Sequence, residues 1–78
     1  MPSPAEIEKA VRECLKIVKD DESLEPGLND PFEDYDIDSL DQMSLALQVE
    51  QQTGINMEGI DPIQLNTIQK YIDKLQSA

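Results

Sequence analysis

The sequence contains no histidine and no tryptophan, and it has a single cysteine among 78 residues. Without histidine, the chain lacks both the commonest general base of enzymes and the commonest metal ligand. The lone Cys14 cannot form a disulfide within the chain, which favours a reducing compartment such as the cytoplasm. Its place beside an apolar helical stripe indicates a buried structural thiol. We therefore expect a protein that is not an enzyme, with no catalytic residue and no metal site.

Long apolar runs and basic residues are also scarce. No run is long enough to span a bilayer, and the N-terminus lacks the basic and apolar pattern of a secretion signal. Seventeen acidic residues against six basic ones give a formal net charge of −11. Nucleic acid and membrane surfaces are therefore poor partners, whereas basic protein surfaces are suitable ones. Ten of the acids crowd residues 20–41, and such a run is most often a solvated loop.

Apolar residues recur at helical spacing in several segments, and no segment alternates in the manner of a strand. Long helices are predicted at about Pro4–Lys19, from Asp38 or Ser39 to Thr53, and after Thr67. Asp61-Pro62, a cap followed by a first-turn proline, predicts a short helix between Glu58 and Leu65. Residues 20–37 follow no period and are predicted to form an ordered loop with room for one helical turn. The expected fold is all-α, a single domain over residues 1–78 built as a small antiparallel four-helix bundle with three long helices and one short one.

Two residue patterns invite a chemical interpretation. Asp34-x-Asp36-x-Asp38 has the spacing that opens an EF-hand calcium loop, but Ser39 and Leu45 occupy the positions that require glycine and glutamate. A dedicated calcium site is therefore not expected. Ser39 stands at a helix start, where serine is commonly a cap, and its replacement by alanine would then cost about 1 kcal/mol.

The residues Asp38-Ser39-Leu40-Asp41 open the central helix directly after the acidic loop. In this motif, in length and in charge, the sequence resembles the acyl carrier proteins over nearly the whole chain. The resemblance implies that Ser39 receives 4′-phosphopantetheine from coenzyme A, and that acyl chains are carried as thioesters on the thiol of this arm. It further implies that Asp38 helps to orient the transferase and its metal-bound substrate, and that Leu40 anchors the helix start.

The resemblance also implies partners. These are a phosphopantetheinyl transferase and the acyl-transferring and synthase enzymes of fatty acid, polyketide or related biosynthesis, which would dock on a monomeric carrier through basic patches. The expected docking residues are Asp34, Asp36, Asp41, Met43 and Glu50. The acyl chain would be sheltered between helices, by residues that could equally well be ordinary core residues: Met43, Leu47, Ile55, Ile60, Ile63 and Leu65.

Two departures from the family pattern stand out. Many carriers of fatty acid synthesis have Leu-Gly where this chain has Tyr35-Asp36, which suggests a different backbone conformation or extra charge beside Ser39. The central helix has Ser44, Gln51 and Gln52 where such carriers present glutamates. A dedicated carrier of a specialised pathway is therefore at least as good an interpretation. The alternative from another class is an unmodified acidic helical module that binds a basic partner; it explains the charge and the helices but not the Asp-Ser-Leu motif.

Overall fold

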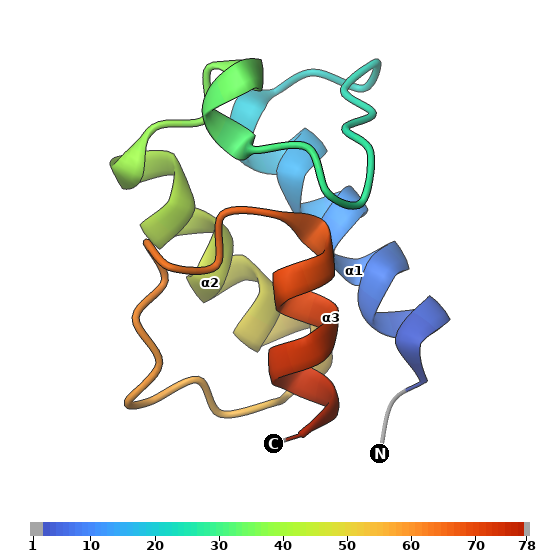
Figure 1. The fold of residues 1–78 in the computed structure, drawn as a ribbon, viewed down its shortest axis with the longest axis vertical. Coiled ribbons are helices and arrows are strands. Elements are labelled where there is room, and N and C mark those ends of the chain that lie inside the picture. The colour runs from blue at the N-terminus through green and yellow to red at the C-terminus, as the bar shows by residue number, and fades with distance from the viewer. Residues whose placement is uncertain (1–2, 78) are drawn as a thin grey trace.

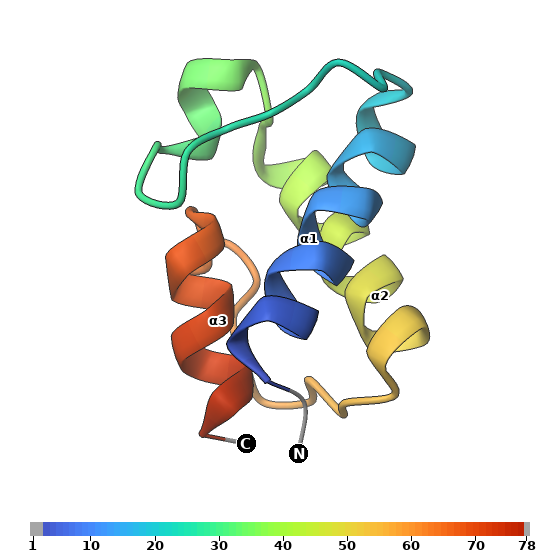
Figure 2. The same cartoon turned by 90° about the vertical axis from the view of Figure 1, so that its right-hand side faces the viewer.

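The computed structural model describes residues 3–77 and is all-helical, as expected. Helices α2 and α3 both pack against α1, which lies between them in the side view (Figures 1 and 2). The central helix of the described residues is therefore α1, and the expectation that the helix opened by Asp38 and Ser39 is central is wrong. Within residues 3–77 there is no strand, and no helix is long and apolar enough to cross a membrane. The elements are α1 (Pro4–Lys19), the 3₁₀ helix η1 (Phe32–Tyr35), α2 (Ser39–Thr53) and α3 (Ile68–Gln76).

The predicted start and end of α1 are confirmed. The Ser3 hydroxyl accepts a hydrogen bond from the Glu6 N–H (3.2 Å), and the Glu6 carboxylate accepts one from the Ser3 N–H (3.3 Å). This reciprocal capping box satisfies N–H groups that have no partner inside the helix. At the other end, Asp20 adopts a left-handed conformation with φ of 51° and stops the helix.

The short fourth helix expected between Glu58 and Leu65 is not formed. The segment has one turn closed by the Ile60 N–H to the Met57 carbonyl (3.1 Å). A second follows, in which the Gln64 N–H donates to the Asp61 carbonyl (3.2 Å) and the Leu65 N–H to the Pro62 carbonyl (3.3 Å). Asp61 does cap its turn, since its carboxylate accepts a hydrogen bond from the Ile63 N–H. Gly59, at φ +85°, lies inside the first turn and interrupts the right-handed backbone there. The cap and the proline therefore begin a turn that never becomes a helix.

The loop between α1 and α2 is ordered and contains one helical turn, η1, as predicted. It passes over the end of the bundle where α1 ends and α2 begins (Figures 1 and 2). Phe32 is fully buried, its N–H donates to the Asn66 carbonyl (2.9 Å), and the Gln69 N–H donates to the Leu28 carbonyl (2.9 Å). These bonds attach the loop to the start of α3. The part of the loop that leads into α2 therefore has a fixed position.

Cys14 is fully buried, which confirms the prediction of a structural thiol. Burial, with a smaller contribution from Glu13, raises the pKa of the thiol to about 11. The thiolate, which is the reactive form, is therefore not populated near neutral pH.

Tyr71 is fully buried in the same core, yet its hydroxyl has no hydrogen-bond partner among residues 3–77. Burial is also the main reason that the pKa of Tyr71 is raised, ahead of the nearby Cys14. Tyr71→Phe removes the unsatisfied hydroxyl and keeps the ring, so we expect the free energy of unfolding to stay equal or to rise by about 1 kcal/mol. Urea unfolding followed by circular dichroism measures this. A fall of more than about 1 kcal/mol would mean that the hydroxyl has a partner in solution.

Candidate functional site

The start of α2 is built around Asp38 rather than Ser39. The Asp38 carboxylate accepts a hydrogen bond from the Asp41 N–H (2.9 Å), and the Asp41 carboxylate accepts one from the Asp38 N–H (3.3 Å). Asp38 is thus the N-cap, and Ser39 is the first residue of the helix. Of the two predicted caps, Asp38 or Ser39, the structure therefore has Asp38.

Ser39 is exposed, and its hydroxyl makes no hydrogen bond to another of the residues 3–77. Its neighbours Asp38 and Leu40 are exposed as well, Leu40 with 71% of its surface. A group esterified to the Ser39 oxygen would therefore displace no side chain and break no bond of the fold. A phosphodiester there would meet the positive end of the α2 dipole, which opposes repulsion by the neighbouring aspartates. The site thus fits a covalently attached phosphate ester.

Asp36, in the position where the family resemblance would place glycine, lies in the left-handed region with φ of 59°. Glycine enters this region without strain, and aspartate is among the few other residues that do so with modest strain. The backbone conformation at Asp36 is thus one that suits glycine. The replacement adds a carboxylate beside Ser39 without moving the backbone out of the left-handed region.

Asp36→Gly and its control Asp34→Gly remove the same charge from different backbone conformations. At Asp36 the relief of left-handed strain offsets the added freedom of the unfolded chain, so the free energy of unfolding should change by less than about 0.5 kcal/mol. Asp34 lies inside η1, where glycine should cost about 0.5–1 kcal/mol. Thermal unfolding of both variants measures the two losses of stability. Equal losses would show that Asp36 is not held in the left-handed conformation in solution.

The five expected docking residues do not share one environment. Asp34, Asp36 and Met43 are exposed, whereas Asp41 and Glu50 are partly buried. The Glu50 carboxylate accepts a hydrogen bond from the Met57 N–H (2.7 Å) and so holds the segment after α2. No group of three acidic or other ligating side chains within residues 3–77 is placed to bind a metal ion.

Asp41 forms an ion pair with Lys19, a residue that the sequence analysis did not single out. The Lys19 ammonium lies 2.9 Å from the Asp41 carboxylate. The hydrogen bond from Lys19 is the main reason that the pKa of Asp41 is lowered, and the same bond raises the pKa of Lys19. The available signal in the sequence was a lysine that ends the first helix directly before a long acidic stretch.

An apolar groove of about 440 Å³ lies between α2 and the segment that follows it. Of the six residues expected to shelter an acyl chain, Met43, Leu47 and Ile60 line this groove. The other three do not: Ile55 packs against the core, Leu65 is buried and Ile63 is exposed outside the groove. The remaining wall comes from residues that the sequence analysis missed: Ala46, Glu50, Asn56, Met57, Glu58 and Pro62.

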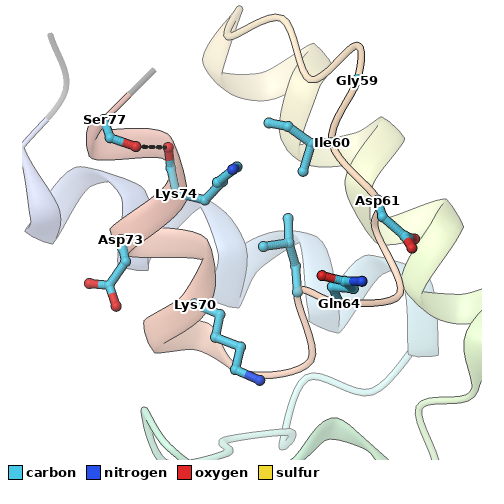
Figure 3. A pocket seen from close by; sticks show the side chains of 9 residues that line it. Gly59, Ile60, Asp61, Gln64, Lys70, Asp73, Lys74 and Ser77 are labelled. Carbon is cyan, nitrogen blue, oxygen red and sulfur yellow. Dashed lines mark hydrogen bonds between the residues drawn. The ribbon is translucent and has the colours of Figure 1, made fainter.

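A second hollow, of about 530 Å³, lies on the other side of the same segment, against α3 (Figure 3). Ile60 borders both hollows. The walls of the second one carry charges of both signs, from Asp61 on the segment and from Lys70, Asp73 and Lys74 on α3. It therefore offers a long apolar chain a less suitable surface than the groove beside α2 does.

The model of a protein family described as "phosphopantetheine attachment site" matches residues 5–75 of the chain. The match spans α1, α2 and nearly all of α3, and it includes the exposed Ser39. No curated protein and no solved structure matches the chain.

Proposed function

The chain belongs to the family of phosphopantetheine attachment domains, and we propose that Ser39 is the residue that bears the group. Domains of this family carry a covalently attached 4′-phosphopantetheine and are carriers rather than enzymes. The observation that carries the assignment of Ser39 is its exposed position at the start of α2, where its hydroxyl makes no hydrogen bond to another of the residues 3–77.

In the proposed modification, the Ser39 hydroxyl gives up its proton and forms an ester bond to the pantetheine-bearing phosphate of coenzyme A. The bond from this phosphate to the nucleotide phosphate breaks, and the nucleotide leaves. Asp38 supports the reaction by capping α2, which fixes the backbone on which Ser39 stands. When bound, the arm supplies a thiol that holds acyl groups as thioesters.

We further propose that the cargo is an acyl intermediate of fatty acid, polyketide or related biosynthesis. Partner enzymes would approach over the exposed part of α2 and the acidic loop before it. Leu40, Met43 and Leu47 expose apolar surface along α2, and Asp34 and Asp36 expose charge next to it. A partner with an apolar patch and a basic rim complements this surface, and its charge would speed the encounter.

The groove beside α2 is proposed to shelter the acyl chain. Each buried methylene group contributes about 0.8 kcal/mol, so burial of a few of them should stabilise the loaded protein by roughly 2 kcal/mol. We expect the melting temperature of the wild type to rise when a medium-length fatty acyl group replaces acetyl on the arm. The rise should be lost in Leu47→Gln and kept in Ile17→Gln, a control at an apolar residue that is equally exposed on α1. An equal rise in both variants would place the acyl chain elsewhere.

Intact-protein mass tests the proposed modification directly. The wild-type chain is incubated with coenzyme A and a broad-specificity phosphopantetheinyl transferase, with an established carrier as the positive control. A gain of one phosphopantetheine supports the proposal. If the positive control is modified and this chain is not, even by a transferase from its native host, the unmodified acidic interaction module becomes the better interpretation.

A further inference from the structure

Lys19 connects the end of α1 to both sides of Ser39. Its ammonium group donates to the Asp36 carbonyl oxygen (2.8 Å) and to the Asp41 carboxylate (2.9 Å). These acceptors lie 17 and 22 residues further along the chain, three residues before Ser39 and two after it. One side chain thus bridges the backbone that enters the site and the first turn of α2.

The first of the two contacts acts on a strained point of the backbone. Asp36 has a positive φ and ends η1, and a non-glycine residue keeps such a conformation only when its surroundings hold it. A hydrogen bond from an ammonium group to the Asp36 carbonyl provides such a hold. On the other side, Ile37 is buried with 1% of its surface exposed and anchors the next residue.

The second contact acts on the cap of α2. The Asp41 carboxylate oxygen that receives the Lys19 ammonium is also the acceptor of the Asp38 N–H (3.3 Å). Lys19 therefore orients the carboxylate that completes the capping box. A charged donor in a hydrogen bond is stronger than a neutral one, and the pair is only about one-quarter exposed.

Lys19 is also a positive charge beside several carboxylates. Its ammonium feels the fields of Asp36, Asp38 and Asp41 together, so it offsets part of the repulsion among three carboxylates that the chain places within six residues. The other two ion pairs within residues 3–77, Arg12–Glu8 and Lys16–Glu25, lie away from the segment 36–41 in the sequence. Loss of Lys19 would remove both its hydrogen bonds to Asp36 and Asp41 and the positive charge that offsets the carboxylates.

We propose that Lys19 is a positioning residue for Ser39, holding residues 36–41 in the conformation that a phosphopantetheinyl transferase binds. This inference rests on the proposed function, because it concerns the same serine. If only part of the free chains have the segment in the binding conformation, the apparent affinity of the transferase falls by that fraction while the bound complex reacts as before. Loss of Lys19 should therefore raise KM and leave kcat unchanged.

The test compares Lys19→Met with Lys16→Met, which removes the same charge from the same helix but breaks only a long ion pair with the exposed Glu25 (3.6 Å). Lys19→Met should raise the KM of the chain as transferase substrate about ten-fold at a kcat within about two-fold of wild type. Lys16→Met should change neither, and Lys19→Arg, which keeps a charged donor for both acceptors, should restore most of the affinity. Lys19→Gln serves as the second variant if Lys19→Met does not fold.

Amide hydrogen exchange of the unmodified chain gives a readout that does not depend on the transferase. The hydrogen-bonded amides of the segment, those of Ile37, Asp38, Asp41 and Gln42, should exchange about ten-fold faster in Lys19→Met than in Lys16→Met, with the core of α1 unchanged. If the wild type is never modified, the proposed function fails and the role of Lys19 in attachment fails with it. If the wild type is modified and the two methionine variants behave alike, only the present inference is overturned. A fall in kcat at constant KM, or no rescue by Lys19→Arg, would overturn it as well.

Discussion

Ser39→Ala is expected to abolish the uptake of phosphopantetheine and to leave the free energy of unfolding within about 0.5 kcal/mol of the wild type. Uptake is lost because alanine has no oxygen on which the ester can form. Stability is kept because Asp38, not Ser39, caps α2, and because the Ser39 hydroxyl is bonded to none of the residues 3–77. Intact mass after incubation with coenzyme A and transferase measures the first effect, and urea unfolding measures the second.

Ser44→Ala is the matched control, since Ser44 is an exposed serine on the same helix. Ser44→Ala should take up phosphopantetheine to the same extent as the wild type. Modification of Ser39→Ala would show that another residue bears the group. A loss of about 1 kcal/mol or more in Ser39→Ala would instead show that serine contributes a cap in solution.

Phe32→Ala is expected to lower the free energy of unfolding by about 3–5 kcal/mol, the usual loss for a buried phenylalanine. The side chain is fully buried, and its ring centre lies 6.4 Å from that of Tyr71 on α3. A chain of this length has a total stability of roughly 4–12 kcal/mol. The variant should therefore lose a large share of its stability, with the loop released from α3. Urea unfolding by circular dichroism is the measurement.

Ile17→Ala serves as the control for this substitution, because Ile17 is a large apolar residue with 59% of its surface exposed. It should change the free energy of unfolding by less than about 0.5 kcal/mol. Phe32→Leu should recover most of the stability by refilling the space. A loss of less than about 1 kcal/mol in Phe32→Ala would mean that the loop is not anchored in the core. The part of the loop that leads into α2 would then have no fixed position.

The helices of this protein could be predicted because their signals are local. The capping box of Ser3 and Glu6, and the glycine after Thr53, act over distances of three or four residues along the chain. The apolar stripe of α1 follows the period of the helix itself. The same local character placed Asp38, Ser39 and Leu40 together at the start of α2, so the family and the candidate serine could be recognised without coordinates.

The same local signals left one choice open and misled at one place. Both Asp38 and Ser39 can cap a helix, and only the geometry of the entering backbone selects Asp38. Asp61-Pro62 can begin a helix, but the residues after it form one turn before Thr67 starts α3. A single turn closes few hydrogen bonds for the backbone freedom it loses, so tertiary packing decides whether it grows.

What the sequence determined by itself is the all-helical architecture, the limits of its first two long helices and the serine motif within a strongly acidic chain. The tertiary structure decided which side chains surround that serine. The hydrogen bonds from Lys19 to Asp36 and Asp41 join residues that are 17 and 22 positions apart. The groove lies between α2 and a following segment whose apolar residues show no regular spacing. Such contacts depend on how the helices and loop pack in space. No spacing along the chain encodes them, because their energy arises only when the whole core has formed.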